Sequence, residues 1–343
     1  PSRRSSKRAP GPGACYFGAM RICVVGAGSI GGLIAAYLAR AGHDVSVVAR
    51  GPHLAAIAAK GVTLVKGADR FTVLCRAADD PASHGPQDAV FIALKAPSVG
   101  AMLPRLGPLL GPETAVVPAL NGIPWWYFHK EGGKFDGTPV GCIDPGGAML
   151  KALDPARILG CVAYPAAETA EPGTVRQTTP EAAFALGELD NKLSARAASL
   201  ATVMTGAGMK TTVSPKIRET VWAKLLGNAS FNPIAALALM RMDQILAEPK
   251  LVGLVRAVMA EAMAVGRAYG IAFPMDADKR LETARGLGRG RPSMLQDVER
   301  GRPLEVEAIV GAVAELARRA GIATPATDAV YALIAACDAA LRA

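Results

Sequence analysis

The stretch from Arg21 to Arg50, RICVVGAGSIGGLIAAYLARAGHDVSVVAR, limits the fold more than any other part of the chain. A short β-branched run is followed by Gly26-x-Gly28-x-x-Gly31, a helical stretch and a second apolar run. In such a unit the glycines allow a tight turn, close approach of a pyrophosphate and close packing of helix on strand, and the helix N-terminus attracts phosphate. The flanking runs argue against a chance glycine-rich turn. The cofactor-binding residues expected here are Gly26, Gly28, Ser29, Ile30 and Gly31.

The residue that ends the second apolar run indicates which nucleotide is bound. Folds of this kind that prefer NAD place Asp or Glu about 20 residues beyond the turn, whereas those that prefer NADP place Arg near the 2′-phosphate. Asp44 stands at the beginning of the run, and Arg50 stands at its end. Arg50 therefore favours NADPH, with a solvated surface arginine as the alternative in this Arg-rich chain.

Length and charge suggest two domains and no nucleic-acid partner. A chain of 343 residues is too long for one small core. Four of its +9 formal charges come from Arg3, Arg4, Lys7 and Arg8, and the remaining +5 is too small to indicate nucleic-acid binding. Residues 1–19 are rich in Pro, Ser and Gly, so we expect a disordered extension or a cloning remnant outside the fold.

Cysteine usage and hydropathy indicate a cytoplasmic protein. The cysteines are dispersed and never form CxxC, which is typical of a reducing compartment and gives no structural zinc site. The apolar stretch 23–39 is interrupted by the glycines of the nucleotide turn, so no membrane partner is expected. The six cysteines are Cys15, Cys23, Cys75, Cys142, Cys161 and Cys337.

Up to residue 213 the chain reads as strands with intervening helices. Runs at 62–65 and 71–74 predict a hairpin or edge pair, and runs at 88–94 and 115–119 predict buried parallel strands. Shorter runs at 158–163, 174–177 and 183–186 suggest that the sheet ends in antiparallel strands. Lys95 and Asn121 follow strands directly, so together with Arg50 they should face one crevice at the carboxyl ends of the sheet.

From residue 214 onward the sequence is helical. This order of strands and helices predicts an α/β Rossmann-type dinucleotide-binding domain over 20–213, followed by an all-α domain over 214–343. Substrate should bind in the cleft between them. The helices expected are 216–231, 249–269, 275–286, 293–300, 303–320 and 326–342, with Gly270 and Gly321 as stops.

Hydride transfer to a ketone requires a proton donor, and the residue inventory favours lysine. All four histidines lie in the first domain, and none is expected at a strand end facing the crevice. A metal-ligand cluster for alcohol chemistry is also missing from the sequence. The histidines are His43, His53, His84 and His129.

The segment WAKLLGNASFNP is the strongest candidate for catalysis. Lys224, Asn228 and Asn232 are four residues apart, so they share one face of an apolar helix that Pro233 should terminate. A buried lysine can act as an acid near neutral pH because burial lowers its pKa. A lysine that snorkels to the surface is the alternative.

Two polar features near residue 300 have both a structural and a catalytic interpretation. Ser293-x-x-Gln296 fits a capping box. Glu305 and Glu307 stand where Pro303 should open a helix, and the helix dipole favours acids at that end. Spacing alone leaves both interpretations open.

Taken together, these residues resemble the ketopantoate reductases (2-dehydropantoate 2-reductases) from Met20 to the end of the chain. The motifs are GAGSIGG with Arg50, LKAP, LNG, WAKLLGNASFNP, SMLQD and GRPLEVEAIVGAV. The resemblance implies NADPH as cofactor, Lys224 as general acid and Glu305 as the residue that helps to orient it and the substrate hydroxyl. It also implies that Lys95 lies by the nicotinamide and the substrate, and Lys95 and Asn121 are expected to bind the cofactor. The substrate site would be lined by Asn121, Asn228, Asn232 and Ser293.

Two departures bear on the substrate. Where some members of that family have a further substrate-binding asparagine, this chain reads Leu239-Met-Arg-Met-Asp243. An aromatic cluster, Trp125 to Phe128, follows Asn121 and Gly122, and core packing explains it better than ligand stacking.

The sequence thus predicts NADPH-dependent reduction of a 2-oxo acid, with 2-dehydropantoate to (R)-pantoate as the leading reaction. Reduction of a different branched 2-oxo acid and a non-catalytic NADP-binding sensor are the alternatives. The expected partner is a small-molecule 2-oxo acid, and a homodimer is the assembly we consider.

Overall fold

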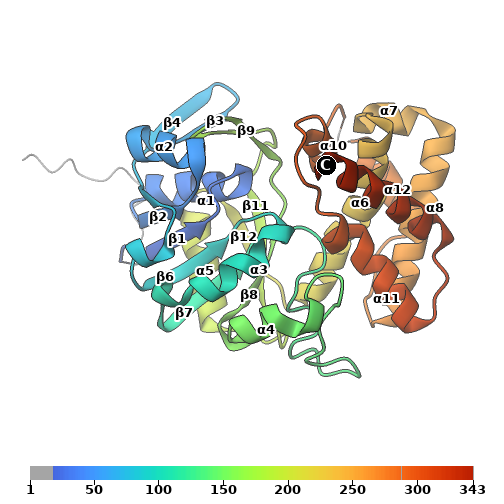
Figure 1. The fold of residues 1–343 in the computed structure, drawn as a ribbon, viewed down its shortest axis with the longest axis horizontal. Coiled ribbons are helices and arrows are strands. Elements are labelled where there is room, and N and C mark those ends of the chain that lie inside the picture. The colour runs from blue at the N-terminus through green and yellow to red at the C-terminus, as the bar shows by residue number, and fades with distance from the viewer. Residues whose placement is uncertain (1–17, 287, 343) are drawn as a thin grey trace, which may run out of the picture.

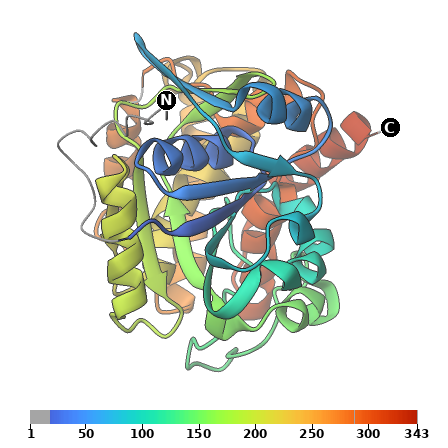
Figure 2. The same ribbon diagram turned by 90° about the vertical axis from the view of Figure 1, so that its left-hand side faces the viewer.

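The computed structural model describes residues 18–286 and 288–342, and its first half is built on a five-stranded parallel sheet. The strand order is β5-β2-β1-β6-β7 (Figure 2). Alternate residues of β1 enter different cores: Ile22 and Val24 pack on the α1 side, and Cys23 and Val25 on the opposite side. Both faces are therefore buried, as expected for a parallel sheet. The strands are β1 (Arg21–Val25), β2 (Asp44–Val48), β5 (Arg76–Ala78), β6 (Gln87–Ile92) and β7 (Leu110–Pro118).

Helix α1 (Ser29–Arg40) begins directly after the glycine turn and lies on this sheet. A Cβ at Gly31 would stand 1.8 Å from the Gly26 carbonyl oxygen, so only glycine permits this approach. The predicted strand–turn–helix unit is thus present, and it fixes the helix N-terminus at the carboxyl end of β1.

Two smaller sheets complete the first half. The predicted hairpin is formed by β3 (Val62–Lys66) and β4 (Asp69–Val73), which pair antiparallel. Strands β8 and β11 also pair antiparallel, but they belong to a separate three-stranded sheet that meets β7 through a single bridge from Val116 to Ile158. The expectation that the main sheet itself ends in antiparallel strands is therefore wrong.

These sheets and the short helices around them contain elements that the sequence did not indicate, among them β5, β9, β12 and α5. The remaining strands are β8 (Leu159–Ala163), β9 (Ala167–Glu171), β10 (Thr174–Gln177), β11 (Ala183–Glu188) and β12 (Lys210–Val213). The helices of this half, besides α1, are α2 (Gly51–Lys60), α3 (Val99–Met102), α4 (Ala148–Ala152) and α5 (Ala195–Gly206).

The second half is helical and lies on the opposite side of the molecule from the parallel sheet (Figure 1). Helix α6 is its centre, because it contacts strands β8 and β11 as well as helices α8, α10 and α12. Helix α7 was not predicted. The helices are α6 (Ile217–Ala238), α7 (Met242–Ala247), α8 (Pro249–Ala268), α9 (Ala277–Arg285), α10 (Ser293–Val298), α11 (Ala312–Ala320) and α12 (Pro325–Arg342).

Two helix boundaries differ from the prediction. Pro233 does not terminate α6, which continues to Ala238 and ends with Leu239 in the left-handed conformation. The missing amide of Pro233 costs about 3 kcal/mol, and burial of the surrounding turns offsets that cost. The helix expected at 303–320 begins as a π-helical turn, Glu307–Gly311, that continues into α11.

Two further observations concern the predicted N-terminal extension and the search for a membrane-spanning helix. Most of the extension expected at 1–19 lies outside the described residues. Within 18–286 and 288–342, no helix combines the length and apolar character needed to cross a membrane.

Candidate active site

Lys224 lies in the middle of α6, largely buried, with its ammonium group held by two oxygen atoms. Its Nζ donates to Asn121 Oδ1 at 2.7 Å and to the Ala163 carbonyl at the end of β8 at 2.5 Å. Burial lowers the pKa of Lys224 to about 8, although the negative charge of Glu305 acts in the opposite direction. The ammonium can therefore release a proton near neutral pH.

Asn121 links Lys224 to Glu305. Its Oδ1 accepts from Lys224, and its Nδ2 donates to Glu305 Oε2 at 3.1 Å. The loop after β7 that carries Asn121 docks on the π-helical turn, since Ile123 N donates to the Ala308 carbonyl at 2.7 Å. Gly122 allows this docking: its φ is +80°, and a Cβ there would stand 2.1 Å from the same carbonyl oxygen.

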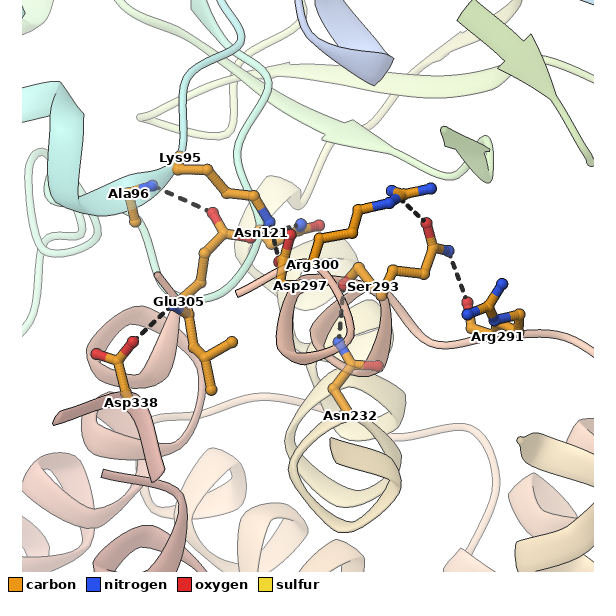
Figure 3. Close-up of polar contacts among 12 residues, drawn as sticks. Lys95, Ala96, Asn121, Asn232, Arg291, Ser293, Asp297, Arg300, Glu305 and Asp338 are labelled. Atoms are coloured by element: carbon orange, nitrogen blue, oxygen red, sulfur yellow. Dashed lines mark hydrogen bonds and ion pairs between the residues drawn. The ribbon is translucent and has the colours of Figure 1, made fainter. Parts of the chain in front are cut away.

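Glu305 is buried just before the π-helical turn, in the loop that follows α10. Its Oε1 accepts from Ala96 N at 3.1 Å, and its Oε2 also accepts from Lys95 Nζ at 3.5 Å. Both oxygens of the Glu305 carboxylate thus accept hydrogen bonds from residues of the first half, which favours the catalytic interpretation of this residue over the capping one. Glu305 lies between the two halves of the molecule (Figure 3).

Asp297 is the member of this group that sequence reasoning missed. Its Oδ2 accepts from Lys95 Nζ at 2.5 Å, and only 5% of the residue is exposed. Burial raises the pKa of Asp297 despite Lys95, whereas Glu305 and Asp297 together outweigh burial and raise the pKa of Lys95. A carboxylate in the last turn of a short helix opposes the helix dipole, and that was the available signal.

The predicted substrate residues of α6 and α10 adjoin this group. Asn232 is buried, and its Nδ2 donates to Ser293 Oγ at 3.3 Å (Figure 3). Asn228 and Lys224 border one small cavity. The capping box expected at Ser293 is absent: Ser293 is the first helical residue, and the Gln296 side chain donates to the Arg291 carbonyl.

A larger cleft of about 750 Å³ opens at the carboxyl ends of β1, β2 and β6. Of the predicted cofactor-binding residues, Gly26 and Arg50 line this cleft, together with Ala27, whereas Gly28, Ser29, Ile30, Gly31 and Asn121 are not among its lining residues. Lys95 does not border it and lies with Asp297 and Glu305 instead. The other lining residues are Val48, Ala49, His53, Leu94, Pro97, Ser98, Ala101, Met102, Arg105 and Arg302.

The residues of this cleft fit a phosphorylated dinucleotide. The cleft is bordered by three arginines, and no Asp or Glu is among the described residues that line it. A Cβ at Gly28 would meet no atom within 4 Å, so space remains over the turn at the N-terminus of α1. Positive charge and an open helix N-terminus both favour phosphate.

His53 corrects the expectation that no histidine reaches the crevice. Its Nδ1 accepts from Gly173 N at 2.9 Å, so its Nε2 carries the proton and donates to the Ala27 carbonyl. The imidazole therefore contacts the backbone of the glycine turn and is not placed as a proton donor to a substrate. The signal was its position three residues after Arg50, on the first turn of α2.

Comparison with known proteins agrees with this geometry. Residues 22–126 match the family model described as Ketopantoate reductase PanE/ApbA, and residues 216–338 match the model of its C-terminal part. The chain belongs to the ketopantoate reductase family. All of the motifs that carry the resemblance fall within the two matched ranges.

Relatives in this family align over almost the whole chain. A 2-dehydropantoate 2-reductase of Mesorhizobium japonicum is 45% identical over 92% of this chain and 97% of its own. A Ralstonia solanacearum crystal structure named as a ketopantoate reductase aligns with a TM-score of 0.90 at 36% identity, over 94% and 99% of the two chains. A D-mandelate dehydrogenase in complex with NADH and anilino(oxo)acetate shares the fold alone, at 20% identity and a TM-score of 0.81 over 94% and 100% of the chains.

The aromatic cluster from Trp125 to Phe128 belongs to the hydrophobic core. Each residue from Trp125 to Phe128 is 1% exposed, as the packing interpretation predicted. Tyr127 accepts a hydrogen bond from Trp222 Nε1 at 2.6 Å, and Trp126 borders the small cavity beside Lys224. The cluster therefore packs against α6 and contacts it through Trp222.

Proposed function

We propose that this chain catalyses the NADPH-dependent reduction of 2-dehydropantoate to (R)-pantoate, with Lys224 as the general acid. One observation carries the proposal: an amide and a carbonyl hold the Lys224 ammonium, and its pKa is lowered to about 8. A group with that pKa is mostly protonated at neutral pH and still donates readily to a developing alkoxide.

Residues of the first half would hold the cofactor. The amides that follow Gly28 at the start of α1 would bind the pyrophosphate, and Arg50 would bind the 2′-phosphate. When bound, NADPH supplies a hydride to C2 of the oxo acid. Lys95, held by Asp297 and Glu305, would lie at the border of nicotinamide and substrate.

The residues around Lys224 would complete the reaction. As C2 gains the hydride, Lys224 Nζ donates its proton to the carbonyl oxygen, which yields the 2-hydroxy acid and a neutral lysine. Asn121 and Glu305 keep the ammonium directed at that oxygen. Asn228, Asn232 and Ser293 would bind the carboxylate and the 4-hydroxyl of the substrate.

In this proposal the two halves of the molecule have different roles in the reaction. Residues 20–213 hold the nucleotide, and residues 214–343 supply the general acid and most of the substrate contacts. The substrate then binds where α6 and α10 face the ends of β7 and β8. The family relationship supports this division, since its two models match one range in each half.

The test is NADPH oxidation with a panel of 2-oxo acids. The most informative pair is 2-dehydropantoate and 3,3-dimethyl-2-oxobutanoate, which differs only by lacking the 4-hydroxyl. A site that hydrogen-bonds a hydroxyl should prefer the first by about two orders of magnitude or more in kcat/KM. Phenylglyoxylate extends the panel to the substrate class of the D-mandelate fold relative.

Each outcome of the panel has a meaning. Equal kcat/KM for the matched pair would assign the chain to another branched 2-oxo acid. Tight NADPH binding without turnover of any acid would support the non-catalytic sensor and contradict the proposal.

A further inference from the structure

Arg302 borders the nucleotide cleft from the helical half of the molecule. Among the described residues that line this cleft, the other members all precede residue 106. Arg302 lies in the loop between α10 and the π-helical turn. The family motifs had drawn attention to Glu305 in this segment and not to Arg302.

Contacts to the first half hold the segment around Arg302 in place. Arg302 N donates to the Asp297 carbonyl at 2.9 Å, and the Asp297 carboxylate is bound to Lys95. On the same turn, the Arg300 guanidinium donates to Glu168 of β9 at 3.1 Å. The backbone of Arg302 is therefore anchored across the interface before any ligand binds.

The charge of Arg302 is available to a ligand. Its side chain is exposed, and within 18–286 and 288–342 no carboxylate lies within 4.0 Å of its guanidinium. Arg105, the third arginine of the cleft, instead pairs with Asp80 at 3.5 Å. An arginine without a partner, facing a cleft that lacks acids, suits a phosphate group.

A bound NADPH would bring two kinds of phosphate group into the cleft, the 2′-phosphate and the pyrophosphate. Arg50 marks the end of β2, where the 2′-phosphate is expected. The glycine turn, where the pyrophosphate is expected, contributes Gly26 and Ala27 to the lining of the same cleft. Arg302 also lines this cleft, so with Arg50 assigned to the 2′-phosphate, the pyrophosphate is the group left for Arg302.

We propose that Arg302 binds the cofactor pyrophosphate from the helical half, so that the dinucleotide is clamped between the glycine turn and the segment that carries Glu305. This inference rests on the proposed function, because it requires a dinucleotide in the cleft. Binding of NADPH would then also hold the catalytic segment against the first half.

The experiment compares Arg302→Ala with Arg50→Ala, using three probes: NADPH, NADH and adenosine 2′-phosphate. Titrations at low ionic strength measure each Kd. Arg302→Ala should weaken NADPH and NADH alike, by about tenfold, and leave adenosine 2′-phosphate unchanged, because only the dinucleotides contain a pyrophosphate. Arg50→Ala should weaken NADPH and adenosine 2′-phosphate and spare NADH.

Arg285→Ala, an exposed arginine of α9 away from the cleft, is the matched control and should change no Kd. The losses in Arg302→Ala should shrink as salt is added. Unchanged Kd values for both dinucleotides, or a loss confined to NADPH, would overturn the pyrophosphate assignment while leaving the proposed function intact. Failure of the unaltered protein to bind NADPH would overturn both.

Discussion

At the scale of single residues, the account depends on how Lys224 is held. An ammonium in an apolar helix would ordinarily be costly, and here two oxygen acceptors and the charge of Glu305 stabilise it. The remaining desolvation lowers its pKa into the range useful for proton transfer at neutral pH.

Replacing this lysine tests the role directly. Lys224→Ala should lower kcat by about two to four orders of magnitude, the usual contribution of general acid catalysis. Lys224→Arg should be similarly impaired, because a guanidinium does not release its proton. NADPH affinity should be unchanged, since Lys224 does not border the nucleotide cleft. Lys216→Ala, at the exposed start of α6, is the control, and normal turnover by Lys224→Ala would refute the role.

Sequence predicted most of this site and missed a part for a physical reason. The four-residue spacing places Lys224, Asn228 and Asn232 on one helix face, which periodicity reveals. The pairing of Asp297 with Lys95 joins residues 202 positions apart in the chain, and nothing local encodes it. The spacing at Ser293 fitted a capping box, but in the structure the Ser293 hydroxyl accepts a hydrogen bond from Asn232 Nδ2 of a different helix.

At the scale of elements, α6 is the structural centre of the site. Arg218, two turns before Lys224, is buried and donates three hydrogen bonds of 2.6 Å to backbone carbonyls of Tyr127, His129 and Leu189. These bonds fix the start of α6 to loops of the first half. The position of Lys224 therefore depends on a residue that does not contact the site.

Arg218→Ala should destabilise the fold by about 3–5 kcal/mol, since it leaves buried carbonyls without partners. Arg218→Lys should recover only part of this loss, because one ammonium cannot reach three carbonyls in the same way. Urea unfolding followed by circular dichroism measures the free energy, with Arg285→Ala as the control. A loss below about 1 kcal/mol would show that these bonds contribute little.

Element boundaries show where local signals fail. The glycine turn, the hairpin of β3 and β4 and most of the helices of the second half follow from periodicity and glycine positions. Pro233 predicted a helix end, yet burial of residues such as Phe231, Ile234 and Ala235 keeps the chain helical beyond it. Such tertiary compensation has no signature in a short window of sequence.

At the scale of the whole molecule, ion pairs join the two halves around the site. Besides the pair of Lys95 with Asp297, Arg300 of the helical half donates to Glu168 of β9 at 3.1 Å. Glu168 also pairs with Arg176 of the same half at 3.0 Å. Replacing Arg300 therefore removes an ion pair between the halves, whereas replacing Arg176 removes an ion pair within the first half.

Arg300→Ala should raise KM for the oxo acid about two- to fivefold with little change in kcat, because a partly exposed ion pair contributes at most about 1 kcal/mol. The same rise should appear in the unaltered protein as salt is increased. Steady-state kinetics measure both effects. Arg176→Ala, which leaves the contact between the halves in place, should change neither constant, and an equal effect of the two variants would contradict this role.

The measurement that tests the central claim most directly is the pH dependence of kcat/KM for reduction of 2-dehydropantoate at saturating NADPH. Lys224 must be protonated to act as the acid, and its pKa is about 8. We therefore expect kcat/KM to fall about tenfold per pH unit above that value. In Glu305→Gln the fall should begin at lower pH, because the carboxylate raises the pKa of the lysine. A value of kcat/KM that stays constant from pH 7 to about pH 10, near the pKa of an unperturbed lysine, would contradict the account.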